Sequence, residues 1–295
     1  MTNMREIRSR MKSIQDIMKI TNAMHLISSS KLKKARKNLA ATEPYFEKLQ
    51  TTIHEILLCS PETLYTEFTE REEIADVDKK RGYIVITADK GLAGAYNHNI
   101  IKLAEEQLKR GQNNFIFTVG QVGRRYFTKK RVTVDVEFLY TAQNPTLHRA
   151  RVIAGTIIDL YRKKELDEVY IIYTKMITPM KSEAQMLQVL PLKKENFEHA
   201  PVRESMSDTD TAVFSPSPEK VMSKVVPNYI KGLIYGALVE AFSSEQNERM
   251  MAMDAATTSA KEMISELSLL YNRARQASIT QEITEIASGA KCAKK

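Results

Sequence analysis

The sequence has few of the residues that would build a disulfide-stabilised, membrane-spanning or exported protein. Its only cysteines, Cys59 and Cys292, form neither a disulfide framework nor a metal-binding spacing, which favours a reducing compartment. It contains no run of about 18 apolar residues, so we expect no membrane-spanning helix. No apolar segment follows the basic N-terminus, and Glu6 and Asp16 come early. The sequence therefore predicts neither a secretory signal nor a removed transit peptide.

Motifs for catalysis are missing as well. There is no G-x-x-x-x-G-K-[ST] stretch, and the five histidines are scattered along the chain. We find no serine–histidine–acid set and no pair of catalytic carboxylates. His25 has no second ligand at helical spacing, so we expect neutral packing rather than metal binding. The sequence predicts no catalytic residue, no cofactor, no metal and no small-molecule substrate bound directly.

One stretch keeps an alternative open. Thr87–Asn97 follows the first predicted strand, where an α/β sheet often places a ligand. Its glycines at 91 and 94 do not match the dinucleotide fingerprint, and a tight strand-to-helix turn explains them equally well. The alternative function is a nucleotide-binding α/β protein with coiled-coil dimerisation arms.

Proline is absent from the last long helical pattern, Tyr229–Ser288, which holds only two internal glycines. Sixty helical residues would make a rod roughly 90 Å long. A globule of about 120 residues has a radius of gyration near 14 Å, so we expect the rod to protrude and to need a partner.

An apolar seam follows this helix at alternating steps of three and four, as is typical of a coiled coil. Half of its members are alanine, which lets a facing backbone approach closely. The predicted seam is Met253, Ala256, Ala260, Met263, Leu267, Leu270, Ala274 and Ala277.

The start of the chain repeats this pattern, with Pro44 inside it as an expected kink. The simplest hypothesis is an antiparallel coiled coil between the two ends of the chain. The seam there is Ile7, Met11, Ile14, Met18, Thr21, His25, Ser28, Leu32, Ala35, Leu39, Thr42, Phe46, Leu49, Ile53 and Ile56.

The middle of the chain alternates strands with helices, which predicts a mostly parallel, doubly wound α/β sheet. The expected strands are 83–87, 115–119, 132–139, 169–173 and, at an edge, 183–190; the expected helices are 99–110, 121–129 and one capped by Asn144 that runs to about 164. We predict three parts: an N-terminal coiled-coil helix (1–60), a central Rossmann-like domain (75–195) and a C-terminal coiled-coil helix (219–288) that pairs with the first.

The net charge of +8 suggests an acidic protein, a nucleic acid or an anionic membrane as partner. The basic run Lys31–Lys37 has no interleaved aromatic residues to stack on bases. We therefore favour an acidic protein partner and expect no nucleic acid.

The end of the last helix keeps three isoleucines, Ile279, Ile283 and Ile286, on one face beyond the seam. Paired with a helix that begins near Met4, this end would overhang its partner. Exposed apolar residues at such an end need a socket from other chains.

Four stretches resemble the signature sequences of the gamma subunit family of F-type ATP synthases. They are Lys19–Met24, Thr87–Asn97, Glu248–Met253 and Asn272–Ile286, and the resemblance runs over essentially the whole chain.

The resemblance implies a non-catalytic rotor shaft, the central stalk of a rotary ATP synthase. It implies a coiled coil in the central hole of a hexamer of alpha and beta subunits, and a globule that sits with the epsilon subunit on the membrane c-ring. Rotation then couples ion translocation to ATP synthesis or hydrolysis. With no transit peptide, we expect a peripheral protein on the cytoplasmic face of the bacterial plasma membrane.

The resemblance also implies roles for single residues. Arg275 and Gln276 match positions that hydrogen-bond to loops of the catalytic subunits. Thr280 and Glu282 match neighbouring positions of the upper bearing, and Met24 matches the position of the first helix that faces them. The isoleucine tip would turn in an apolar channel without fixed polar bonds.

Overall fold

The structure is a computed structural model of the 295-residue chain. It describes residues 4–59, 68, 74–111, 113–132, 134–138, 142–193, 196–197 and 214–292. The chain forms two compact units. We call Ser30–Glu248 the sheet unit, and Met1–Ser29 with Arg249–Lys295 the helix-pair unit. Two long helices, α1 (Met4–Cys59) and α5 (Pro218–Cys292), contribute to both units.

The sheet unit contains a five-stranded sheet in the order β3-β2-β1-β4-β5. The first four strands are parallel, and β5 pairs antiparallel with β4 at one edge. This confirms the predicted mostly parallel sheet with residues 183–190 on an edge. The strands are β1 (Arg81–Ile86), β2 (Asn114–Val119), β3 (Val136–Phe138), β4 (Glu168–Thr178) and β5 (Lys181–Leu190).

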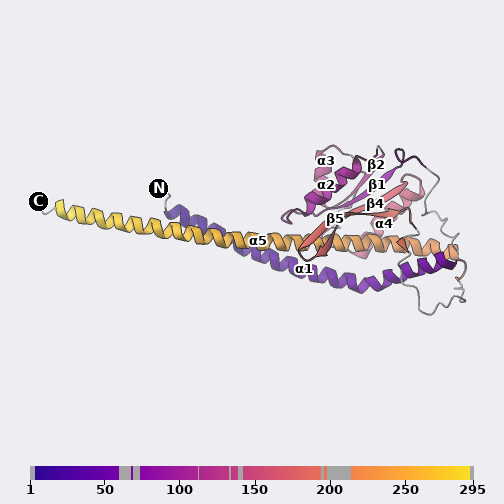
Figure 1. Ribbon diagram of the computed structural model, residues 1–295, viewed down its shortest axis with the longest axis horizontal. Helices are drawn as coiled ribbons and strands as arrows, with labels where there is room; N and C mark the ends of the chain where they lie inside the picture. The colour runs from indigo at the N-terminus through magenta and orange to yellow at the C-terminus, as the bar shows by residue number, and fades with distance from the viewer. Residues whose placement is uncertain are drawn as a thin grey trace. The chain divides into compact units, whose positions relative to one another are not determined.

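Both faces of this sheet are covered. Every residue of β1 is buried, although successive side chains of a strand point to opposite faces. Tyr83 and Val85 join one apolar cluster with α2 (Tyr96–Leu108) and α3 (Gln121–Lys129). Ile84 and Ile86 join the other, with α4 (Leu147–Arg162) and parts of α1 and α5. Figure 1 shows α2 and α3 on one side of the sheet and α5 on the other.

The third strand is much shorter than the predicted strand 132–139, part of which lies outside the described residues. Asp135 exchanges two hydrogen bonds with Ile116 of β2. Its backbone N–H donates to the carbonyl of Ile116 at 2.9 Å, and its carboxylate accepts from the N–H of Ile116 at 2.8 Å. A side chain thus takes the place of a strand residue, and regular pairing starts only at Val136.

The predicted cap of α4 was wrong. Asn144 and Pro145 lie before the helix, and Thr146 is the N-cap, with its hydroxyl accepting from the N–H of Arg149 at 3.3 Å. Threonine in an extended conformation satisfies one of the free N–H groups of the first turn, as an N-cap requires.

Helix α5 begins at Pro218, one residue before the predicted C-terminal part (219–288) and eleven before the proline-free pattern Tyr229–Ser288, and it runs through Pro227. Met222, Val226, Ile230 and Ile234 are buried at steps of four and belong to the core cluster of the sheet unit. Packing of this stripe outweighs the hydrogen bond that a proline removes. Helix α1 likewise continues through Pro44.

Within the sheet unit, α1 and α5 approach closely at one glycine. A Cβ added to Gly232 would lie 2.1 Å from Cδ1 of Phe46. The ring of Phe46 therefore occupies the space that any other side chain at position 232 would need, which fixes the packing of the two helices.

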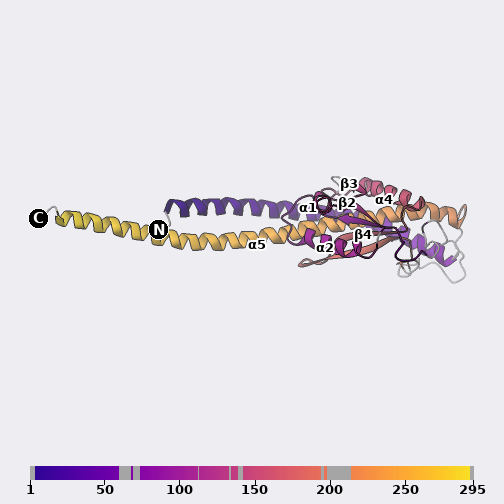
Figure 2. The same ribbon diagram turned by 90° about the horizontal axis from the view of Figure 1, so that it is seen from above.

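In the helix-pair unit, the N-terminal part of α1 lies beside the C-terminal part of α5, as Figures 1 and 2 show. The direction is antiparallel, because Thr21 contacts Thr257 whereas Ile7 lines a groove with Ala274 and Ala277. In α1 every predicted seam position from Ile7 to Ser28 is buried or half-buried.

The predicted seam of α5 was right in part. Five of its positions, Met253, Ala256, Ala260, Leu267 and Ala274, are buried or half-buried, but Met263, Leu270 and Ala277 are exposed and the inward residue lies one position later. Met263 and Leu270 are 52% and 50% exposed. The prediction counted apolar residues only, and three of the four inward positions that it missed are polar or amphipathic. These four positions are Thr257, Ile264, Tyr271 and Ser278.

Thr257 and Thr21 form a polar layer between the two helices. The hydroxyl of Thr257 lies 2.7 Å from that of Thr21, and both side chains are buried. One hydroxyl donates across this contact, and the other donates within its own helix, where the carbonyl of Met253 lies 2.9 Å from Thr257 and that of Met18 lies 3.0 Å from Thr21. A buried polar contact of this kind selects one register of two paired helices over its neighbours.

Candidate functional site at the end of the helix pair

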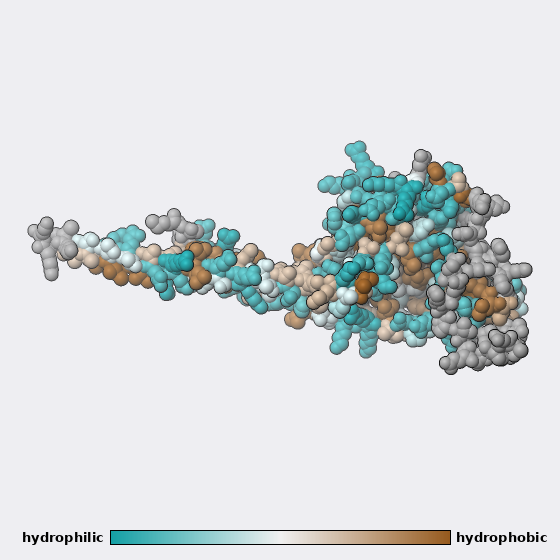
Figure 3. All heavy atoms as spheres, viewed as in Figure 1, coloured by the Kyte–Doolittle hydropathy of each residue, from teal (hydrophilic) through white to brown (hydrophobic). Residues whose placement is uncertain are grey.

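The C-terminal end of α5 exposes an apolar face. Ile279, Ile283 and Ile286 are 47%, 61% and 73% exposed, and every residue from 279 to 290 is exposed. Met4 of α1 lines a groove that reaches Gln281 of α5, so the isoleucines lie at and beyond the first described residue of α1. Figure 3 shows apolar side chains on this part of the surface. No described residue of the chain packs over this face.

The polar residues predicted for this end lie on the same two turns. Arg275 and Glu282 are seven residues apart, and Ile279 lies between them on one helical face. Arg275 is exposed and has no hydrogen-bond or ion-pair partner among the residues that the structure describes. Its guanidinium can therefore bind a carboxylate or a carbonyl of another chain.

Gln276 and Thr280 are coupled within the helix. The hydroxyl of Thr280 donates to the carbonyl of Gln276 at 2.9 Å, so it is directed along the helix. The carboxylate of Glu282 accepts from the hydroxyl of Ser278 at 3.5 Å. The amide side chain of Gln276 is exposed and free to bind elsewhere.

A second apolar stripe runs along α1 and was missed by the sequence reasoning. Ile17, Ile20 and Ile27 are exposed, with half-buried Met24 between them. Their spacing of three, four and three places them on one face beside the seam. The same counting of steps that found the seam could have found this stripe. Met24 is thus brought into an apolar surface, but no described contact joins it to Arg275 or Glu282.

The loop Thr87–Asn97 uses its polar groups internally. The side chain of Asn97 accepts from the N–H of Ala88 at 2.9 Å, and Asp89 accepts from the N–H of Gln121 at the start of α3. The hydroxyl of Thr87 accepts from the N–H of Gly123 and donates to the carbonyl of Val119. The side chains of Thr87, Asp89 and Asn97 and the N–H of Ala88 are therefore used to hold the turn itself, which favours the tight-turn interpretation.

Gly120 explains why small residues are needed around this loop. Its φ is +94°, and an added Cβ would lie 2.1 Å from the carbonyl oxygen of Thr87. The glycine allows α3 to begin directly against the end of β1.

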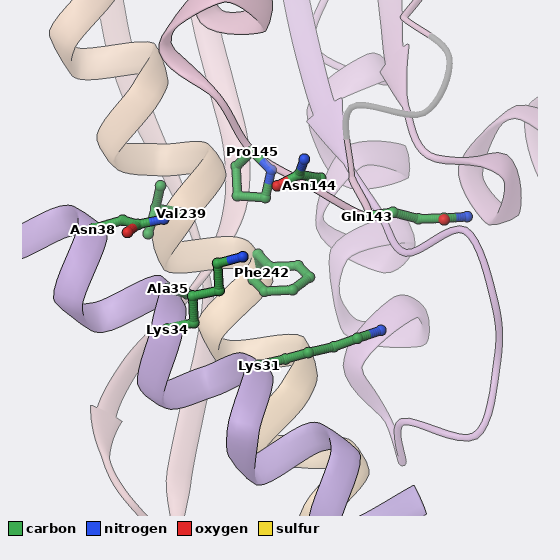
Figure 4. A pocket seen from close by; sticks show the side chains of 9 residues that line it. All are labelled: Lys31, Lys34, Ala35, Asn38, Gln143, Asn144, Pro145, Val239 and Phe242. Atoms are coloured by element: carbon green, nitrogen blue, oxygen red, sulfur yellow. The ribbon is translucent and has the colours of Figure 1, made fainter.

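The basic run of α1 borders a cavity of about 210 Å³ in the sheet unit. Figure 4 shows Lys31 and Lys34 of α1 on one side and the residues preceding α4 on the other. Ala35 and Phe242 supply apolar walls, and none of the described residues that line the cavity is acidic. The cavity is therefore positively charged, as the acidic-partner interpretation of this run requires.

A half-buried ion-pair network was not signalled by any motif. Glu168 accepts from Arg81 at 2.9 Å, from Lys79 at 2.8 Å and from the hydroxyl of Tyr170 at 2.9 Å. Burial alone would raise the pKa of Glu168, but these hydrogen bonds outweigh it and lower the pKa. Burial, and then the bond to Glu168, raises the pKa of Tyr170. With its oxygens held by three donors, Glu168 joins β1 to β4 rather than acting as a base.

No helix in the described part of the chain combines the length and apolar character needed to cross a bilayer. No group of three or more His, Cys, Asp or Glu side chains that could hold a metal ion occurs among the described residues.

Comparison with known proteins decides the family. The profile of a protein family described as "ATP synthase" matches residues 3–292. The "ATP synthase gamma chain" of Acetivibrio thermocellus is 48% identical over all of both chains. That of Ruminiclostridium cellulolyticum is 49% identical over 98% of each chain. The chain belongs to the ATP synthase gamma chain family.

A solved structure shares this fold. A chain of the Euglena gracilis mitochondrial ATP synthase, described as "OSCP/F1/c-ring, rotational state 3", superposes with a TM-score of 0.66. The superposition covers 98% of this chain and 94% of that chain at 16% identity, so it shows the shared fold alone.

Proposed function

We propose that this gamma chain is the central-stalk, or rotor-shaft, subunit of a rotary F-type ATP synthase. It is a non-catalytic subunit of that complex and couples ion translocation through a membrane c-ring to ATP synthesis or hydrolysis. Because a single asymmetric shaft contacts three catalytic sites differently, turning it favours a different conformation at each site in sequence.

The observation that carries this proposal is the uncovered isoleucine face at the end of α5. Apolar contacts are non-directional, so Ile279, Ile283 and Ile286 can change neighbours during rotation at little cost. The α1 stripe around Met24 offers a second apolar surface of this kind. A channel lined with apolar groups, supplied by the alpha and beta subunits, fits both surfaces.

The two helices of the helix-pair unit form, in this proposal, an antiparallel coiled coil. Residues 1–60 and 219–288 make up the shaft, and residues 75–195 form a doubly wound, Rossmann-like domain. The seven-residue repeat of buried positions in α1, and its counterpart in α5, support the coiled coil.

The polar residues near the tip take separate roles. Arg275 and Gln276 bind loops of the catalytic subunits through their exposed donors. Thr280 and Glu282 contribute to the bearing around the isoleucines, and Met24 faces the same region from α1. The lysines beside the 210 Å³ cavity face acidic loops of a partner.

The remaining partners follow from the same assignment. The sheet unit binds the epsilon subunit and the c-ring, and the chain is peripheral on the cytoplasmic face of a bacterial plasma membrane. The chain needs no cofactor or substrate of its own for this function.

The test is reconstitution with alpha, beta and epsilon subunits and the membrane sector, using two neighbouring variants. Ile283→Asp places a charge on the isoleucine face, whereas Thr284→Asp places the same charge one residue away. We expect a stoichiometric complex with the unchanged chain and with T284D. We expect I283D to lower ATP-driven ion transport by about tenfold or more, because a charge is costly in an apolar channel.

Two results would count against the proposal. One is failure of the unchanged chain to enter the complex under conditions where known gamma chains do so. The other is equal transport by the I283D and T284D complexes, which would show that the isoleucine face touches nothing that matters for turning.

A further inference from the structure

The far half of the β4–β5 hairpin extends beyond the rest of the sheet. The pairing of β4 with β1 ends at Ile172, whereas β4 and β5 remain paired as far as Thr178 and Lys181. A two-stranded ribbon of this length is only marginally stable unless it packs on another element. We call residues 173–184 the ribbon; Figures 1 and 2 show this end of the hairpin beside α5.

Three side chains of α5 bind the backbone of this ribbon. Glu240 accepts from the N–H of Met176 at 3.0 Å. Ser244 donates to the carbonyl of Thr174 at 3.0 Å. Asn247 donates to the carbonyl of Pro179 at 2.8 Å.

These three residues form one stripe, because their spacing of four and three places them on the same helical face. Beyond Ile172 no strand in the described part of the chain pairs with β4 on the side of β1, and side chains of α5 bind the backbone of Thr174 and Met176 instead. Ser244 and Asn247 are 0% and 2% exposed, so water cannot replace these bonds without separating the two elements.

The directions of these bonds have a mechanical consequence. The apolar core of the sheet unit also holds α5, but apolar contacts tolerate a small turn of a helix about its axis. Hydrogen bonds weaken steeply when the angle changes, and three on one stripe would all be lost by the same turn. The stripe therefore fixes the rotational setting of α5 against the ribbon.

We propose that Glu240, Ser244 and Asn247 form a rotational clamp that passes torque between the ribbon and α5. This inference rests on the proposed rotor function and adds the residues that transmit the load within this subunit. They are positioning residues, since they act on α5 and not on any reacting group.

The experiment compares complexes reconstituted into lipid vesicles with the unchanged chain, with E240A/S244A/N247A and with two controls. The control S223A removes a hydroxyl that donates only to its own helix, at the carbonyl of Lys220. The control E240Q keeps an oxygen that accepts from Met176. Two quantities are measured: amide hydrogen exchange of residues 173–178, and ions transported per ATP hydrolysed.

For the triple variant we expect exchange in the ribbon to rise by about tenfold or more, because three bonds are lost together. Transport per ATP should fall severalfold while ATP hydrolysis continues. S223A and E240Q should match the unchanged chain in both measurements. If the triple variant does not assemble, S244A against S223A makes the same comparison with one bond.

The outcomes separate the two proposals. If exchange rises but transport per ATP stays unchanged, or if exchange does not rise, the clamp is wrong and the rotor function stands. If the unchanged complex shows no coupling between transport and hydrolysis, the rotor function fails and the torque role fails with it.

Discussion

The two parts of helix α5 are built on different physical principles. In the sheet unit its inward residues, such as Ile230, Ile234 and Leu238, are at most 2% exposed and belong to a large apolar core. In the helix-pair unit the inward positions include Thr257, Tyr271 and Ser278, while Met263 and Leu270 face outward. One part of the helix is enclosed by its own chain, and the other leaves apolar side chains such as Met263 and Leu270 exposed.

The largest expected difference comes from removing an isoleucine in each part. Ile234→Ala should lower the free energy of unfolding by about 2–5 kcal/mol, because it leaves a cavity in the core. Ile283→Ala should change it by less than about 0.5 kcal/mol, since its side chain is exposed. Denaturant titration of the purified chain measures both. Similar losses for the two variants would remove the distinction between the parts.

A pair of glycines sharpens the description of the sheet unit. Gly232→Ala places a Cβ against Phe46 and should cost about 1–3 kcal/mol of stability. Gly236→Ala meets nothing within 4 Å and should add about 0.5–1 kcal/mol, because alanine favours the helix. Thermal unfolding of both variants tests this, and a stable G232A would show that Phe46 does not fix the helix approach.

The polar layer of the helix-pair unit predicts a coupling between two residues. Thr21→Val and Thr257→Val should each cost about 0.5–1.5 kcal/mol, because the remaining hydroxyl loses a buried partner. The double variant should cost less than the sum by about 1 kcal/mol. Hydrogen exchange of α1 amides near Thr21 measures the loss of stability in the two single variants and in the double variant. Strict additivity would mean that the hydroxyls do not interact.

The smallest effect concerns pH and Glu168. The pKa of Glu168 is lowered in the folded chain. Its contribution to folding stability is therefore present above its unfolded pKa of about 4.3 and is lost as the pH falls through its folded pKa. Stability of the sheet unit should therefore fall on acidification from about pH 5 downward, and less steeply in Glu168→Gln. If the free energy of unfolding falls equally steeply with acidification in both proteins, Glu168 is not a source of acid sensitivity.

The sequence predicted the sheet well because its central strands are short continuous apolar runs, as is typical of a parallel sheet covered on both faces. It also located the seam of α1, whose inward residues recur at steps of three and four. It failed where polar side chains replace backbone or apolar partners. Asp135 shortens β3, Thr146 caps α4, and Thr257 occupies a seam position that an apolar count passes over.

Proline limited a second reading of the sequence. The proline-free pattern Tyr229–Ser288 stops short of Pro227, whereas α5 continues through it because Met222 and Val226 reach the core. At the candidate site, the isoleucine face was visible as a pattern. The roles of Arg275, Gln276, Thr280, Glu282 and Met24 stay predictions, because they depend on the shape of other chains.

Observation of rotation in single complexes tests the central claim most directly. With Cys59 and Cys292 replaced by serine, Lys109→Cys at the exposed end of α2 would carry a bead, and the complex would be held through its beta subunits. Our account predicts that the bead turns continuously in one direction when ATP is added. A bead that stays still while the same complexes hydrolyse ATP would contradict it.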